Sequence, residues 1–307
     1  MSRFTHAGRV RRVIDIPEEL AAVQELYNGD RGREFIAGLP TLIEDFLERW
    51  DLRPDGSPMH GVAALVLPVV RRADGTPAVL KLQLLDEESA GEPVALRLWD
   101  GDGAVRLLDH DPVTHTMLLE RLDSARMLST LPGTRDAVLV IAGLLAHLTA
   151  TPAPAGLRHL GDIAHAMLDK TPDALKRVPD AETRRTVADC AAAVREVVDE
   201  PGDRLLHCEN VLASDRASWL AIDPKPLAGD PGFELWPALD NRFDADEITW
   251  RFDAMTDVLG LDRARARAWT MGRLLQNALW DIEDGRPVEP RRLTIAHRLR
   301  THRSRQP

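Results

Sequence analysis

The chain has 307 residues, of which 44% are hydrophobic and 29% are charged, and its formal net charge is −10. This length and balance are typical of a globular protein with room for two lobes and a substantial core. No apolar run approaches the roughly 20 residues of a membrane span, and the acidic balance argues against a nucleic-acid partner. The same charge fits a cationic small-molecule partner.

The N-terminal sequence and the cysteine content indicate the compartment. The opening residues, MSRFTHAGRVRRVIDIPEEL, contain no apolar core of a secretory signal. The two cysteines, Cys190 and Cys208, are too few for a disulfide framework. We therefore expect a cytoplasmic protein, and nothing in the sequence indicates its oligomeric state.

The first third of the chain changes from helical to strand periodicity. Pro17-Glu18-Glu19 suits a first helical turn, and apolar residues recur at helical spacing as far as Trp50. Asp74-Gly75 then joins two apolar segments, which is a strong hairpin signal. The expected elements are strands over 62–70 and 77–84, a helix over 89–99, and short strands near 104–108 and 116–119.

After Leu122 the pattern is mostly helical. The predicted helices cover 135–148, 157–168, 181–198, 246–259, 262–284 and 291–300, with short strand-and-loop elements near 205–212 and 219–222. This arrangement predicts an α+β, two-lobe, protein-kinase-like fold. Its N-terminal lobe, a small antiparallel sheet with helices over 1–122, would be the nucleotide side, and its C-terminal lobe over 123–307 would be mostly helical.

The most informative motif is His207-Cys208-Glu209-Asn210, followed by Asp223 after an apolar segment. Kinase-type phosphoryl transfer uses a loop H-x-D-x-x-x-x-N, in which Asp receives the acceptor proton and Asn binds Mg²⁺. A second metal-binding Asp follows the loop. The position five residues before Asn210, where the base belongs, is Leu205. The proton-accepting Asp is therefore missing.

Asn210 and Asp223 are the candidate metal ligands. Residues 211–212 and 219–222 look like two strands of a hairpin that would bring these side chains together. Mg²⁺ prefers such hard oxygen ligands. Alternatively, Asp223 only initiates the turn before Pro224.

Lys81 is the candidate phosphate-binding residue. Strand alternation places it on the face opposite Leu80, among apolar neighbours, where an ammonium group needs a partner. In a kinase the partners are the nucleotide phosphates and a Glu of the next helix. Glu92 is the first candidate for that Glu, with Glu87 and Glu88 as rivals. The alternative is an edge-strand lysine that faces water.

Two further sets of residues are candidates for ligand contacts. Residues 117–122, with Glu120 and Leu122, would form a hinge whose backbone reads the adenine edge, or else a plain connection between lobes. A possible acceptor wall combines carboxylates and an amide with an aromatic ring, which suits a cationic polyhydroxylated compound. The alternative is a solvated face with a packed Trp. The wall consists of Asn277, Trp280, Asp281 and Asp284 on one predicted helix face, extended by Glu234 and Asp240.

Long segments of the chain resemble a known family. Residues 219–236, WLAIDPKPLAGDPGFELW, and 274–285, LLQNALWDIEDG, closely resemble the streptomycin 6-kinase branch of the aminoglycoside phosphotransferases, also called aminoglycoside/hydroxyurea resistance kinases. The likeness extends from about Arg33 onward. It implies a kinase-like fold, ATP, Mg²⁺ and phosphorylation of a hydroxyl of a streptomycin-like antibiotic. By position, Lys81 would meet the phosphates, Glu92 would orient it, and Asn210 and Asp223 would hold the metal.

The chain departs from the family at the catalytic loop. The family stretch reads H-x-D-x-H-x-E-N, so four residues are missing here and His207 corresponds to either family histidine. Four residues span at most about 13–14 Å, so we expect Asn210 or the hairpin to shift. Losing a positioned base typically costs roughly 10²–10⁴ in rate. His207 and Glu209 are doubtful replacements, and Asp203 also lacks the family spacing. The alternatives are a catalytically inactive binding protein and a kinase for another small hydroxyl compound such as hydroxyurea.

Overall fold

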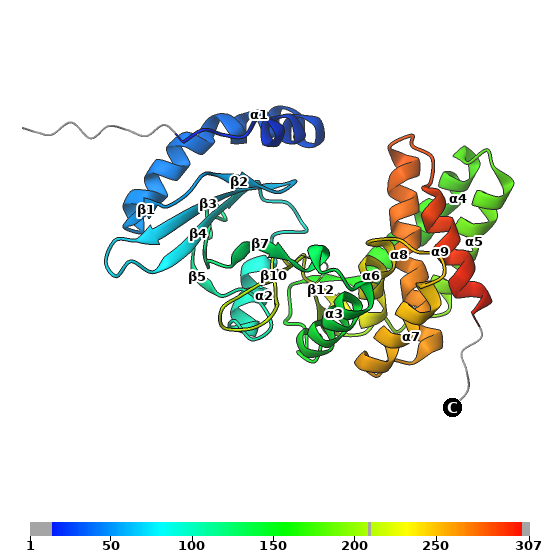
Figure 1. Cartoon of the computed structure of the whole chain (residues 1–307). Coiled ribbons are helices and arrows are strands. Elements are labelled where there is room, and N and C mark those ends of the chain that lie inside the picture. Colours follow the sequence, from blue (N-terminus) through cyan, green and yellow to red (C-terminus); the bar gives the residue numbers. More distant parts are fainter. Residues whose placement is uncertain (1–13, 208–209, 303–307) are drawn as a thin grey trace, which may run out of the picture. The chain divides into compact units, whose positions relative to one another are not determined.

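The computed structural model describes residues 14–207 and 210–302, and the described chain divides into two compact units (Figure 1). The first, called the sheet unit here, comprises residues up to Asp86 together with Leu107–Arg121. The second, the helical unit, comprises Glu87–Arg106 and the chain from Leu122 onward. The second of these units begins again at Leu122 and also includes residues 87–106, and the division into a nucleotide side over 1–122 and a helical lobe over 123–307 stays a prediction. No described helix is long and apolar enough to cross a membrane.

The sheet unit is an antiparallel sheet with one long helical segment. The strands run in the order β1-β3-β4-β6-β5, and β2 also pairs with β3. The predicted hairpin is confirmed as β3 and β4, which pair from Ala64 opposite Gln83 to Val70 opposite Pro77. The elements are α1 Glu18–Arg49, β1 Leu52–Pro54, β2 Met59–His60, β3 Ala64–Arg71, β4 Pro77–Gln83, β5 Leu107–His110 and β6 Met117–Glu120.

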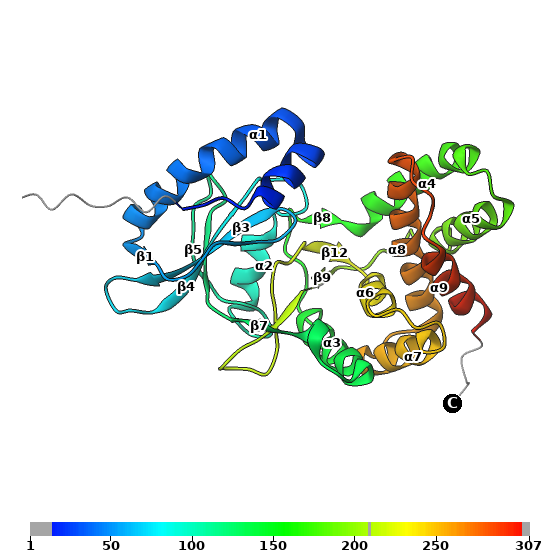
Figure 2. The same ribbon diagram turned by 45° about the horizontal axis from the view of Figure 1, so that its top comes forward.

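Helix α1 covers one face of this sheet (Figures 1 and 2). Strand alternation points Leu65 and Leu67 of β3, and Leu80 and Leu82 of β4, into a buried cluster with apolar side chains of α1. The helix is interrupted at Gly29, where φ is 54° and ψ is −130°, a conformation that only glycine adopts readily. The helices expected in this first stretch are therefore present as two helical segments joined at that glycine.

The helical unit contains most of the predicted helices, together with short strands that the sequence did not reveal. Strands β7, β8 and β12 have only two to five residues, too few for an alternating pattern to be visible. The elements are α2 Glu92–Trp99, β7 Asp123–Met127, the 3₁₀ turn η1 Leu128–Thr130, α3 Thr134–Leu148, β8 Arg158–His159, α4 Leu160–Arg177, α5 Ala181–Arg195, β9 Arg204–Leu206, β10 Val211–Ala213, β11 Leu220–Ala221, β12 Leu227–Gly229, the 3₁₀ helix η2 Pro231–Leu235, α6 Trp236–Asp240, α7 Ile248–Leu259, α8 Arg263–Glu283 and α9 Pro290–Thr301.

Helix α4 is longer than predicted. It continues through Pro172 to Arg177, whereas the sequence pattern ends at residue 168. Met167 and Ala174 are buried on the side where α4 packs against α5 and α8. Tertiary packing therefore extends the helix past a proline that disfavours it locally.

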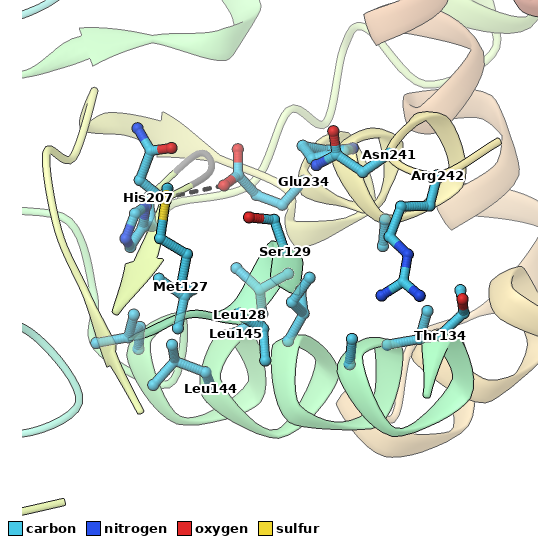
Figure 3. Close-up of a pocket in the computed structure, with 18 residues that line it drawn as sticks. Met127, Leu128, Ser129, Thr134, Leu144, Leu145, His207, Glu234, Asn241 and Arg242 are labelled. Carbon is cyan, nitrogen blue, oxygen red and sulfur yellow. Dashed lines mark hydrogen bonds between the residues drawn. The ribbon is translucent and has the colours of Figure 1, made fainter. Parts of the chain in front are cut away.

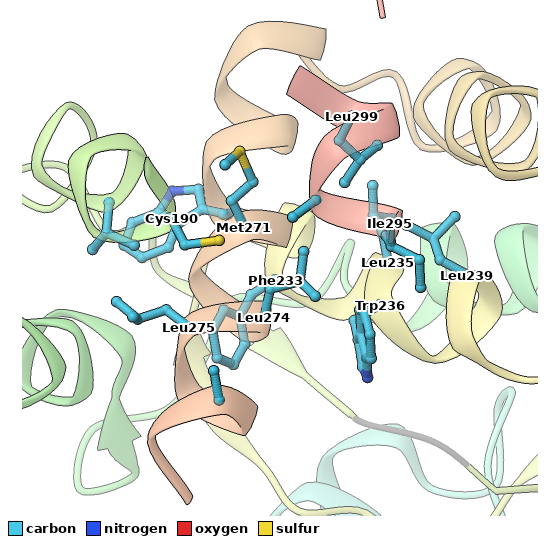
Figure 4. Close-up of a cluster of buried hydrophobic side chains, with 14 of the residues drawn as sticks. Cys190, Phe233, Leu235, Trp236, Leu239, Met271, Leu274, Leu275, Ile295 and Leu299 are labelled. Atoms are coloured by element: carbon cyan, nitrogen blue, oxygen red, sulfur yellow. The ribbon is translucent and has the colours of Figure 1, made fainter. Parts of the chain in front are cut away.

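Helix α8 is the centre of the helical unit. It packs against α4, α5, α9 and η2, so it is buried on nearly every side (Figure 4). Phe233 of η2 and Leu274 of α8 belong to this core. Gly232 allows the close approach, because a Cβ there would lie 2.7 Å from the Ala266 Cα. The Thr270 hydroxyl donates to the Gly232 carbonyl at 2.9 Å and fixes the contact.

Asp111 organises the turn between β5 and β6 of the sheet unit. Its buried carboxylate accepts hydrogen bonds from the backbone N–H groups of Val113 and Thr114 and from the Thr114 hydroxyl, and it pairs with Arg49. Burial raises its pKa, but the hydrogen bonds from Thr114, Arg49 and Val113 outweigh that effect and lower the pKa to about 2.

We expect Asp111→Asn to lower the free energy of unfolding by about 2 kcal/mol at neutral pH, since hydrogen bonds to a buried charge are lost. Because the folded-state pKa is depressed, this contribution is fully present above the unfolded pKa of about 3.9 and is lost as the pH falls towards 2. Urea unfolding at pH 7 and below pH 4 measures it, with Asp109→Asn as control, because Asp109 is an exposed aspartate of the same hairpin. Equal stability of the two variants at pH 7 would contradict this role.

Candidate active site

Backbone hydrogen bonds join His207 and Asn210, the two ends of the shortened catalytic loop, to the segment that carries Asp223. The Lys225 N–H donates to the His207 carbonyl at 2.9 Å, and the Ile222 N–H donates to the Asn210 carbonyl at 2.9 Å. Strands β10 and β11 pair as predicted, with Val211 opposite Ala221. The four-residue connection therefore leaves the hairpin formed, and Asn210 lies beside the segment that continues into Asp223.

The backbone of Asp223 adopts an unusual conformation. Its φ is 51°, in the left-handed region that L-residues other than Asn and Asp seldom occupy. A residue before proline normally adopts extended backbone, and Pro224 follows directly. Such a conformation costs of order 1–3 kcal/mol and tends to occur at functional sites. It supports a role for Asp223 beyond that of a simple turn initiator.

Asn210 and Asp223 line one cavity of about 200 Å³ in the helical unit. It also contains Lys225, Arg158, Arg273 and, among the predicted acceptor residues, Trp280. We call it the basic cavity. The other predicted acceptor residues are absent from its described lining.

Arg273 is one of three cationic lining residues, with Arg158 and Lys225, that sequence reasoning missed. Its guanidinium lies 5.9 Å from the Trp280 ring centroid and 5.2 Å from that of Phe233. The aromatic face proposed for a cationic acceptor is thus already in contact with a cation of the chain. The sequence did contain a signal for Arg273, because it stands at helical spacing with Asn277 and Trp280 and therefore falls on the same helix face.

Two carboxylates of the predicted acceptor wall are paired with arginines. Asp281 is 3% exposed and forms ion pairs with Arg292 and Arg286. Asp284 is exposed and pairs with Arg286 at 2.8 Å. Asn277 is also buried, and its backbone carbonyl accepts a hydrogen bond from Arg292 at 3.1 Å. Their contact with an acceptor stays a prediction.

The remaining acidic candidates lie apart from the basic cavity. Asp240 pairs with Arg291 at 3.0 Å, and burial raises the pKa of its carboxyl although Arg291 opposes the shift. Glu234 is buried and accepts a hydrogen bond from the His207 N–H at 3.1 Å. Glu234 therefore supports the start of the loop.

A second, more apolar cavity of about 270 Å³ lies beside the same loop (Figure 3). His207, Asn210 and Glu234 line it together with Met127 and apolar residues of α3. Arg242 lines it as well, at the end away from His207 in the view shown. This cavity offers space next to the point where the family has four more residues.

No described residue occupies the position of a catalytic base. Leu205 is fully buried in β9, where it pairs with Ala228. Asp203 lines a different cavity behind β9 that shares no residue with the other two. The His207 ring is buried, with its centroid 5.9 Å from that of Trp99. Glu209 lies outside the described residues.

The structure places the predicted phosphate lysine inside the sheet. Lys81 lies on β4 between β3 and β6, opposite Val66 and Met117, and is 4% exposed. The alternative of a water-facing lysine on an edge strand is therefore wrong. Glu92 opens α2 in the helical unit and is fully buried, and the pairing of Lys81 with Glu92 stays a prediction.

Glu87 and Glu88, the rivals of Glu92 as partner of Lys81, lie in the helical unit, and the predicted hinge residues lie at the end of β6 and just after it. Glu88 lies 3.5 Å from Arg158 in an ion pair, and Glu87 is exposed. Glu120 ends β6 opposite Ala78, and Leu122 is the half-buried first residue of the helical unit after β6. Their nucleotide contacts stay predictions.

The oxygen-bearing side chains in the basic cavity are compatible with the predicted Mg²⁺ site, and metal binding stays a prediction. The described residues contain no group of three or more His, Cys, Asp or Glu side chains arranged to hold an ion. Asn210 and Asp223 supply two hard oxygen ligands in one cavity. Mg²⁺ commonly takes one or two protein ligands and completes its shell with phosphates and water.

Comparison of the sequence with known proteins identifies relatives over nearly the whole chain. A family model described as aminoglycoside/hydroxyurea antibiotic resistance kinase matches residues 49–285. A hydroxyurea phosphotransferase of Kitasatospora aureofaciens is 61% identical over 92% of this chain and 85% of its own. A streptomycin 6-kinase of Streptomyces glaucescens is 54% identical, over 95% of this chain and 99% of its own.

Solved structures confirm the two-lobe, protein-kinase-like fold. A choline kinase from Streptococcus pneumoniae matches with a TM-score of 0.55 at 14% identity, over 85% of this chain and 97% of its own. A thermostable aminoglycoside phosphotransferase mutant, in a ternary complex with ADP and hygromycin B, matches with a TM-score of 0.55 at 15% identity, over 84% of this chain and 96% of its own.

We expect Asp281→Asn to lower the free energy of unfolding by about 3 kcal/mol, because it leaves the mostly buried guanidinium of Arg292 without its anion. Asp284→Asn, at an exposed ion pair, should cost less than about 1 kcal/mol. Denaturant unfolding of both variants measures the difference. If Asp281→Asn instead raises the KM of the acceptor at unchanged stability, the predicted acceptor role is correct.

Proposed function

Because the chain belongs to the aminoglycoside/hydroxyurea antibiotic resistance kinases, we propose that it transfers the γ-phosphoryl group of ATP to a hydroxyl of an antibiotic. The observation that carries this proposal is the pair of Asn210 and Asp223 in one cavity, held there although the loop between β9 and β10 is short. This is the order and spacing of oxygen ligands that kinase-type transfer uses.

The roles of the chain's residues follow from their chemistry. Asn210 and Asp223 hold Mg²⁺, which neutralises phosphate charge when bound. Lys81, buried in the sheet, contacts the nucleotide phosphates, and Glu92 orients it. Glu120 and Leu122 present the backbone that reads the adenine. The reaction takes place in the cytosol, where ATP is available.

Streptomycin is the first candidate acceptor. Relatives from Streptomyces glaucescens and Streptomyces griseus, at 54% and 50% identity over almost their full length, carry the name streptomycin 6-kinase. Their names concern those proteins, and for this chain they indicate which acceptor to assay first. The acidic residues that would meet a cationic drug are Glu234, Asp240, Asp281 and Asp284, beside Asn277 and Trp280.

Hydroxyurea is a second candidate, favoured by two observations at the site. The basic cavity contains three cationic side chains, which favour a neutral acceptor over a guanidinium compound. The position of the base is taken by Leu205, and the N-hydroxyl of hydroxyurea is more acidic than a sugar hydroxyl, so it needs a base less. The relative named hydroxyurea phosphotransferase is 61% identical.

The missing base also leaves a third reading, in which the chain binds its ligands without turnover. Calorimetry with Mg·ATP, streptomycin and hydroxyurea, run beside a phosphate-transfer assay for each acceptor, separates the three. We expect Mg·ATP to bind and transfer to be slow. Binding without any transfer would mean that the chain is an inactive binding protein, and no binding of Mg·ATP would refute the proposed kinase activity.

We expect insertion of Gly-Asp-Gly-His between His207 and Cys208 to raise kcat with streptomycin by roughly 10²–10⁴, because it restores a positioned base. The apolar cavity beside His207 and Asn210 gives the new residues space. A matched insertion of Gly-Asn-Gly-His controls for loop length. If both insertions give the activity of the unmodified chain, the loop gap does not limit turnover.

A further inference from the structure

The charge of the basic cavity is opposite to the charge of the whole chain. The chain carries a formal net charge of −10, yet the ionisable groups that line this cavity are three cations and two acids. The cations are Arg158 of β8, Lys225 after β11, and Arg273 of α8. Three separate elements therefore direct positive charge to the place where the candidate metal ligands lie.

Lys225 is held in position by its backbone. Its N–H donates to the His207 carbonyl, and buried prolines lie on both sides of it at positions 224 and 226. The side chain is half-buried and forms no ion pair with a described residue. A partly desolvated ammonium group beside Asn210 and Asp223 is well placed to bind an anion.

Arg273 is held by its side chain. It lies over the rings of Phe233 and Trp280 and donates to the Gln276 side chain at 3.0 Å. These contacts fix a planar guanidinium at the cavity wall, so little side-chain entropy is lost when it binds a ligand. Arg158 is partly neutralised by Glu88 at 3.5 Å and contributes less.

We propose that Lys225 and Arg273, assisted by Arg158, bind the phosphoryl group during its transfer and in the phosphorylated product. The assignment rests on the proposed function, because ATP supplies the group. As the bond from the γ-phosphorus to the bridging oxygen of ADP breaks, the bond to the acceptor oxygen forms, and the hydroxyl proton passes to water. Negative charge spreads over the three non-bridging oxygens in this step, and fixed cations stabilise it.

This assignment explains how a chain without the loop Asp can still accelerate transfer. In a loose transition state the acceptor oxygen has formed little of its new bond, so most of the stabilisation is directed at the phosphoryl group. The candidate metal ligands and the cations supply that stabilisation. They line the basic cavity, which is formed although the loop is short.

The test uses the full chain and two readouts. Calorimetric titration with inorganic phosphate measures anion binding without catalysis. We expect Lys225→Gln and Arg273→Gln each to weaken phosphate binding about tenfold, Lys225→Arg to retain most of it, and Lys176→Gln, at an exposed site of α4, to match the unmodified chain. Thermal unfolding confirms that each variant is folded.

The second readout is turnover with Mg·ATP and the best acceptor. We expect Lys225→Gln to lower kcat about 10²-fold with little change in the KM for ATP. If the unmodified chain does not bind phosphate, or if the glutamine variants bind it equally well, the proposed anion site is wrong. If phosphate binding depends on Lys225 and Arg273 but no acceptor is phosphorylated, the anion site stands and the proposed kinase function fails.

Discussion

Two backbone hydrogen bonds determine the geometry of the candidate site. They join His207 to Lys225 and Asn210 to Ile222, so the loop and the segment around Asp223 form one pinned structure. Because these bonds need only main-chain atoms, they tolerate the loss of four residues from the loop. Between these two hydrogen bonds Asp223 adopts its left-handed backbone, and Asn210, Asp223 and Lys225 all line the basic cavity. The predicted impairment therefore concerns the catalytic base, while the described hairpin of β10 and β11 is formed.

Charge pairing engages three carboxylates of the predicted acceptor wall. Asp281, Asp284 and Asp240 are each engaged by arginines from α9 or the segment before it. The pairs of Asp240 and Asp281 attach α9 to α6 and α8, and a carboxylate neutralised by an arginine attracts a cationic acceptor less. Lys225 and Arg273 are directed instead at the cavity that contains Asn210 and Asp223. These contacts support the proposed phosphate-binding role of the basic cavity, and the acceptor contacts of the acidic residues stay a prediction.

The sequence predicted the local features and missed those that depend on packing. The Asp-Gly turn, the alternation around Lys81 and the hairpin from Val211 to Ala221 are determined by neighbouring residues, and all three are confirmed. Helical spacing placed Asp281 and Trp280 on one face. It could not predict that Arg292 of α9 forms an ion pair with the Asp281 carboxylate. Helical spacing could have placed Arg273 beside Trp280, but Arg158 and Lys225 are far from it in sequence and meet it only through the fold, so the cationic wall as a whole could not be predicted.

A missing base does not affect all acceptors equally. A general base accelerates transfer more when the acceptor hydroxyl holds its proton more tightly as the hydroxyl oxygen reaches phosphorus. This follows from the Brønsted behaviour of proton transfer. A sugar hydroxyl keeps its proton strongly, whereas an N-hydroxyl gives it up to water more easily. If Asn210 and Asp223 hold the metal and the cations bind the phosphoryl group, as proposed, we expect a site with Leu205 at the base position to discriminate among acceptors by acidity as well as by shape. On this proposal the loop gap changes which acceptors are used before it abolishes transfer.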